Sequence, residues 1–149
     1  LSIDAGTSKT WNKVKGVNNF DNVLKNLEKY SACSIRPEQV TLKYIILPGI
    51  NNNLEDYQGI IDIMKQLKIK KLIISRDNRF RIEKLIICNS YKSKPEYNNE
   101  RYSVTDRAAG YLTAMLRQSG MSAENGFFWP DDYQKADSIA NELRGLNII

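Results

Sequence analysis

The sequence contains no histidine and only two cysteines, Cys33 and Cys88, which do not have the spacing of a metal site. The lack of histidine excludes Ser-His-Asp and Cys-His nucleophile systems, histidine-ligated zinc and imidazole acid–base catalysis within these residues. We expect both cysteines to be inert, reduced thiols, which favours a cytoplasmic location. Any chemistry in this stretch must therefore use carboxylates, lysines, hydroxyl groups or a bound cofactor.

Long apolar runs and dense patches of charge are also missing. No apolar stretch approaches the roughly 18 residues of a membrane span, and the first residues do not resemble a secretory signal, so we expect no membrane partner. The net charge of +5 comes from 22 basic and 17 acidic residues. These charges are dispersed along the chain, and a stripe of basic residues interleaved with aromatic ones is missing, which argues against a nucleic-acid partner.

Apolar residues make up 42% of the 149 residues, enough for the core of one ordinary domain. Runs typical of buried strands alternate with segments that have apolar residues at helical spacing. The predicted strands are residues 1–4, 40–47 and 71–75, and the predicted helices are residues 19–30 and the segment that follows Asn53. This rhythm predicts an α/β fold with a parallel sheet. The sheet is either an open, doubly wound one or a partial (β/α) barrel, an incomplete version of the TIM-barrel type.

The alternation becomes less regular after Asp77. We predict a first unit over residues 1–80, with residues 81–149 either continuing the barrel or forming an appended α/β segment. The C-terminal helices are expected to begin at predicted caps, Ser103 or Thr105 for one and Pro130 for the other. The predicted elements are a strand at 81–91, a loop at 92–102, a helix at 105–118, a strand at 126–129 and a helix at 130–144.

The opening turn invites two phosphate-binding interpretations. A Walker A loop requires glycine directly before its lysine, but Ser8 precedes Lys9 here, so that loop is excluded. The stretch D-A-G-T at residues 4–7 matches the acidic phosphate loop of sugar kinases, which joins two strands of a hairpin. Here a helical segment follows instead, so we predict a strand-to-helix turn, with Lys13 and Lys15 on a solvated part of it. A nucleotide-binding α/β domain of the sugar-kinase-like or another type remains an alternative.

Polar side chains occur at or near the ends of three predicted strands. Ser2 and Asp4 share one face of the first strand because side chains alternate with period two, Lys43 interrupts the apolar second strand, and Ser75 ends the third. The carboxyl ends of parallel strands form the ligand site in α/β folds. These groups would suit a ligand with ribose hydroxyls, an adenine edge and a carboxylate. The structural alternatives are that Asp4 caps the turn at Gly6 and that Lys43 pairs with a carboxylate at the rim.

Four segments together resemble the second half of the barrel of radical S-adenosylmethionine (radical SAM) enzymes. They are SIDAGTSKTWNKVKG, FDNVLKNLEKY, VTLKYIILPGIN and LIISRD, and they cover about the first half of the chain. The resemblance implies a partial barrel that carries S-adenosylmethionine across its strand ends, with Ser2, Asp4, Lys43 and Ser75 as contacts. It also implies reductive cleavage of this cofactor at a 4Fe–4S cluster to give a 5′-deoxyadenosyl radical.

Members of this family hold the cluster through a C-x-x-x-C-x-x-C motif, which this sequence lacks. The expectation is a fragment of a longer enzyme whose cluster ligands lie outside this stretch; a degenerate, non-catalytic barrel is the alternative. The resemblance further implies an electron donor such as flavodoxin or ferredoxin, and a peptide or small-molecule substrate. Acid–base residues are not needed for such chemistry, because the cofactor supplies it.

Overall fold

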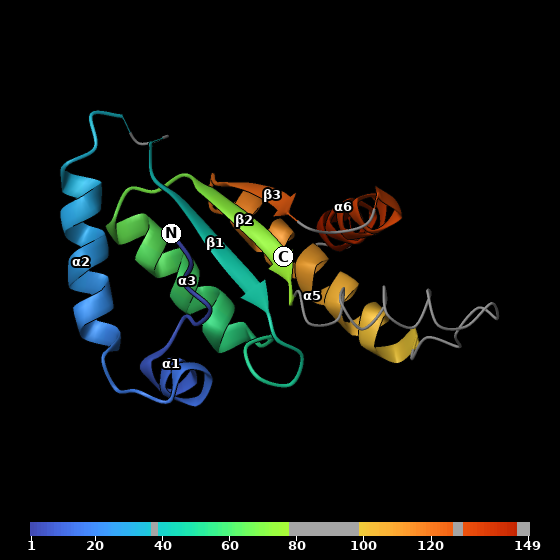
Figure 1. Ribbon diagram of the computed structural model, residues 1–149. Helices are drawn as coiled ribbons and strands as arrows, with labels where there is room; N and C mark the ends of the chain where they lie inside the picture. Colours follow the sequence, from blue (N-terminus) through green and yellow to red (C-terminus); the bar gives the residue numbers. More distant parts are fainter. Residues whose placement is uncertain (37–38, 78–98, 127–129, 146–149) are drawn as a thin grey trace.

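The computed structural model describes residues 1–36, 39–77, 99–126 and 130–145. Helices and parallel strands alternate along them, which confirms the predicted α/β class (Figure 1). In chain order the elements are α1 (Ser8–Lys15), α2 (Phe20–Ala32), β1 (Thr41–Ile46), α3 (Leu54–Gln66), β2 (Lys71–Arg76), α5 (Asn99–Gln118), β3 (Ser122–Gly126) and α6 (Pro130–Gly145). Among the described residues, no helix is both long and apolar enough to cross a membrane.

The strands form one parallel sheet in the order β1-β2-β3. Residues 1–3 lie along the other edge of β1 and run parallel to it: Lys43 N donates to Leu1 O at 2.7 Å, and Ile3 N donates to Lys43 O at 2.8 Å. Spatial order therefore equals chain order, with helices in the connections (Figure 1). A doubly wound sheet reverses its strand order at a switch point, and the strands described here do not reverse.

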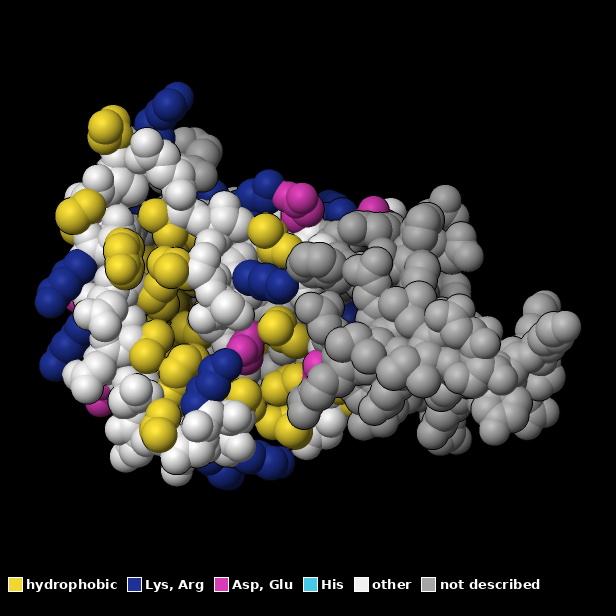
Figure 2. Space-filling view, in the orientation of Figure 1, with side chains coloured by type: hydrophobic (Ala, Val, Ile, Leu, Met, Phe, Trp, Pro, Cys, Tyr) yellow, Lys and Arg dark blue, Asp and Glu magenta, His cyan; other side chains and the backbone are white. Residues whose placement is uncertain are grey.

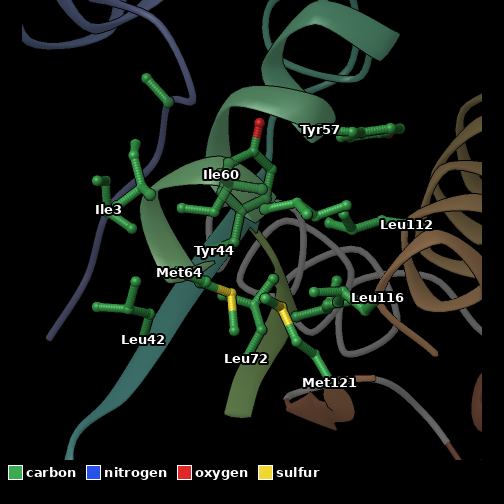
Figure 3. Packing of buried hydrophobic residues seen from close by; sticks show 14 of the residues in the cluster. Ile3, Leu42, Tyr44, Tyr57, Ile60, Met64, Leu72, Leu112, Leu116 and Met121 are labelled. Carbon is green, nitrogen blue, oxygen red and sulfur yellow. The ribbon is translucent and has the colours of Figure 1, made fainter. Parts of the chain in front are cut away.

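One face of the sheet forms the hydrophobic core. The side chains of Leu42, Tyr44, Leu72 and Ile74 on this face are fully buried. Figure 3 shows Leu42, Tyr44 and Leu72 against apolar residues of α3 and α5, among them Ile60, Met64, Leu112 and Leu116. The alternating burial in β1 follows from the period of two, which sends every second side chain into the core.

The opening turn leads from the first strand segment directly into helix α1, as the predicted strand-to-helix turn requires. Thr7 is the N-cap, and its Oγ1 accepts from Thr10 N at 3.2 Å. Gly16 ends the helix in the left-handed conformation (φ 72°), which glycine adopts without steric cost. Lys13 and Lys15 lie in the last turn of this helix. Both lysines are exposed, as expected, but they belong to a helix and not to a turn, because the two caps were not recognised in the sequence.

The helix predicted at 19–30 and the strands predicted at 40–47 and 71–75 match α2, β1 and β2 to within one or two residues. Helix α1 was not predicted, and two predictions after residue 77 differ from the structure. Helix α5 begins at Asn99 rather than near Thr105, so residues 99–102 are helical instead of forming a loop. Strand β3 spans Ser122–Gly126, so it begins four residues before the predicted strand at 126–129, of which only Gly126 is described. Its sequence, SAENG, has little β-propensity, and pairing with β2 places it in the sheet. The predicted strand at 81–91 and residues 127–129 lie outside the described residues. The unit boundary at residue 80 stays a prediction.

Candidate functional site

The four residues predicted to contact a ligand, Ser2, Asp4, Lys43 and Ser75, lie on the sheet face opposite the core, here called the polar face. Ser2 pairs with Lys43, and the sheet register places Ile45 beside Ser75. Because paired residues of parallel strands point to the same side, this face carries three rows of side chains across the sheet. The rows are Thr41, Lys71 and Ser122, then Ser2, Lys43, Ile73 and Glu124, and finally Ile45, Ser75 and Gly126, with Asp4 beside Ile45.

Asp4 is the acidic centre of the polar face. The residue is 5% exposed, and its carboxylate accepts from Ser2 Oγ at 3.0 Å and from Ile45 N at 3.4 Å. Its second oxygen accepts from Lys15 Nζ at 2.6 Å. The carboxylate is thus held by side-chain and backbone donors while lying beside the end of β1. Figure 2, in the orientation of Figure 1, shows basic and acidic side chains next to one another in the described part, beside an apolar stripe.

Lys15 is a site residue that sequence reasoning missed. The last turn of α1 brings its ammonium group to Asp4 and to 5.5 Å from the centroid of the Trp11 ring. Its side chain is 36% exposed, so the ammonium group can be reached by a ligand as well as by Asp4. The signal that could have found it is the pair of caps at Thr7 and Gly16, which define a helix of fixed length after the strand.

Lys43 and Ser75 differ in their surroundings. Lys43 is half-buried in the middle of β1, next to Ser2. Ser75 is fully buried, and its hydroxyl has no hydrogen-bond partner among the described residues. A buried hydroxyl without a partner costs free energy, which a ligand group could recover. Beside it, a Cβ atom on Gly126 would come to 3.1 Å from Ser75 Oγ and 2.7 Å from Ile73 Cγ2, so only glycine fits next to these two side chains.

Arg76 and Asp77 follow Ser75 at the end of β2. Arg76 points to the opposite face, where its guanidinium is 9% exposed and forms an ion pair with Asp106 of α5. This pair joins the strand end to the helix layer. It gives Arg76 a structural role away from the polar face.

The turn at Gly6 is held by Asp56 of α3, and not by Asp4. The Asp56 residue is 1% exposed, and its carboxylate accepts from Gly6 N at 2.9 Å, Thr10 Oγ1 at 2.7 Å and Asn53 Nδ2 at 2.8 Å. The suggestion that Asp4 caps this turn was therefore wrong. Since Asp56 satisfies the turn, the carboxylate of Asp4 accepts instead from Ser2, Ile45 N and Lys15 on the polar face.

The turn and α3 also approach each other closely. A Cβ atom on Gly6 would come to 1.9 Å from the backbone oxygen of Asp56, and one on Gly59 would come to 2.2 Å from the backbone oxygen of Gly6. Only glycine at both positions allows this contact. The contact fixes where the first strand segment ends, and with it the position of Asp4.

Asn51 joins the ends of the first two strand segments. The residue is fully buried, and its Nδ2 donates to Asp4 O at 2.9 Å and to Ile45 O at 2.8 Å. Its backbone oxygen accepts from the Tyr44 hydroxyl at 2.8 Å. Burial, with a further contribution from Asp56, raises the pKa of Tyr44 far above its ordinary value, so the phenol stays neutral and keeps donating this bond. The strand ends are therefore rigidly spaced.

Metal ligands are not gathered at this site. Within the described part of the chain, there is no group of three or more His, Cys, Asp or Glu side chains that could hold a metal ion. Cys33 is exposed at the end of α2, beside Leu1 and Thr41 at the opposite end of the strands. Cys88 lies outside the described residues.

The fold and the site together define an α/β protein with a sequentially ordered parallel sheet that has a polar face opposite its core. Comparison of the chain with family models, curated proteins and solved structures found no match.

Proposed function

We propose that this chain is part of a radical SAM enzyme and that its polar face holds S-adenosylmethionine. The observation that carries the proposal is the convergence of Ser2, Asp4, Lys43 and Ser75 on one sheet face. Sequential parallel strands with α3 and α5 against the other face suit a partial (β/α) barrel, in which the polar face would line the interior. The resemblance of residues 1–77 to this family supplies the ligand class.

The chemistry of these residues fits the cofactor. Lys15 and Lys43 can bind its carboxylate, while Asp4 can accept from an ammonium or ribose hydroxyl group. The buried hydroxyl of Ser75 offers an unused donor and acceptor. When bound, S-adenosylmethionine would supply a sulfonium that can be cleaved reductively. The residues of this chain bind and orient it, and the buried strand ends limit the access of water.

A 4Fe–4S cluster does not fit the described residues, because the one cysteine among them, Cys33, lies at the opposite end of the strands. In this proposal its ligands belong to another part of the enzyme. The reducing electron would come from a protein such as flavodoxin or ferredoxin, and the substrate would be a peptide or small molecule. This chain then acts as the cofactor-orienting half of the barrel.

Titration with S-adenosylmethionine tests the proposal in the full-length, reconstituted protein. A hydrogen bond to an ionised group contributes roughly 1.5–3 kcal/mol, so Asp4→Ala, Lys15→Met and Lys43→Met should each weaken binding about tenfold or more. The iron content of each variant should equal that of the unmodified protein. Lys13→Met is the matched control, since Lys13 is an exposed lysine in the same helix as Lys15.

Two results would contradict this assignment. If Asp4→Ala and Lys43→Met both bind S-adenosylmethionine with unchanged affinity, these two residues have structural roles only. Binding of ATP in place of S-adenosylmethionine, lost in the same variants, would assign the polar face to a nucleotide-binding domain instead.

A further inference from the structure

A cavity lies on the core side of the sheet, opposite the polar face, between the start of α3 and the middle of α5. Its volume is about 350 Å³. It lies in the helix layer that covers the core face, so it is separate from the polar face and independent of the function proposed there. Its walls include Asn52, Asn53, Leu54, Tyr57, Arg107 and Tyr111.

The polar groups of this cavity are mainly hydrogen-bond donors. Arg107 is exposed and takes no part in the salt bridges found among the described residues. The side-chain oxygen of Asn52 already accepts from Gly49 N at 2.6 Å, which leaves its amino group to donate. The N-terminus of the 13-residue helix α3 adds backbone N–H groups, although Glu55 and Asp56 in its first turn offset part of its positive dipole end. None of the residues that line the cavity is acidic.

Tyr57 gives an independent indication of a ligand. The residue is 3% exposed, and its hydroxyl has no hydrogen-bond partner among the described residues. Figure 3 shows its ring extending from α3 toward α5, which is where the cavity lies. The Tyr111 ring lies 6.4 Å away, centroid to centroid, at an interplanar angle of 31°. A buried phenol hydroxyl without a hydrogen-bond partner costs free energy, unless an acceptor on a ligand bonds to it. The rings of Tyr57 and Tyr111 together form an aromatic wall of the cavity.

We propose that this cavity binds a small ligand that carries an anionic phosphate or carboxylate group attached to an aromatic ring. The anion lies against the Arg107 guanidinium and the start of α3. The ring packs against Tyr57 and Tyr111. Phosphate and carboxylate share the acceptor chemistry that a guanidinium recognises, so the choice between them is left to the probes.

Isothermal titration of the protein with phenyl phosphate and with benzoate tests this site. We expect saturable binding of at least one probe in the low millimolar range or tighter, and a loss of about tenfold or more in Arg107→Gln. In Tyr111→Leu, the advantage of phenyl phosphate over inorganic phosphate should shrink, because one of the two ring contacts is gone. The control is Arg117→Gln: Arg117 lies in the same helix, and its NH2 group is 2.7 Å from Asp137 Oδ1.

The site is independent of the polar face, so Asp4→Ala should leave the binding of both probes unchanged. The proposal is overturned if neither probe binds saturably to the unmodified protein. It is also overturned if Arg107→Gln binds the probes as tightly as Arg117→Gln does.

Discussion

Replacing Gly59 by alanine should lower the free energy of unfolding by about 3 kcal/mol, the upper part of the range for overpacking a buried contact. The new Cβ would lie 2.2 Å from the backbone oxygen of Gly6 and 2.7 Å from its carbonyl carbon, so the whole turn must move away from α3. Alanine favours a helix over glycine by about 1 kcal/mol, and this gain only partly offsets the clash. Urea unfolding followed by circular dichroism measures the change.

The same substitution should also weaken ligand binding at the polar face, because the turn at Gly6 fixes the position of Asp4. Gly145→Ala is the matched control. Gly145 ends α6, and nothing lies within 4 Å of the position its Cβ would take. Its replacement should leave stability unchanged or raise it slightly. A Gly59→Ala protein as stable as Gly145→Ala would show that the close contact between the turn and α3 does not exist.

Asp56→Ala should destabilise the protein by a similar amount, about 3 kcal/mol. The substitution removes the acceptor for Gly6 N, Thr10 Oγ1 and Asn53 Nδ2, and each buried donor left without a partner costs roughly 1–3 kcal/mol. Water entering the space would recover part of this cost. The first turn of α3 also loses a negative charge that favours its N-terminus. The measurement is again the urea midpoint and slope.

The variant Asp56→Asn separates the contribution of the hydrogen bonds to stability from the contribution of the negative charge. It keeps one oxygen to accept from Gly6 N but turns an NH2 group toward the amide of Asn53, so we expect about half the loss seen for alanine. Asp62→Ala serves as the control on the same helix, because Asp62 is exposed and accepts only from Gln58, at 2.8 Å. That variant should stay within about 0.5 kcal/mol of the unmodified protein. A loss in Asp56→Ala no larger than in Asp62→Ala would rule out the role of Asp56 in holding the turn.

The sequence by itself determined the alternation of strands and helices over the first 77 residues. Strands β1 and β2 and helices α2 and α3 lie where the periodic patterns predict them, because apolar periodicity and breakers such as Pro48-Gly49 are local signals. The sequence also placed Ser2 and Asp4 on one side of their strand. Side-chain alternation requires this once the segment is extended, and parallel pairing then brings Lys43 and Ser75 to the same face.

Only the tertiary structure decided which groups complete the site and what holds it. The carboxylate that secures the turn belongs to Asp56, 50 residues from Gly6, and Lys15 rather than a residue of the sheet neutralises Asp4. The position of β3 follows from pairing with β2, and the unpartnered hydroxyls of Ser75 and Tyr57 follow from burial. Composition and residue spacing do not predict these features. Each depends on groups that are distant in the sequence and meet only when the helices pack on the sheet.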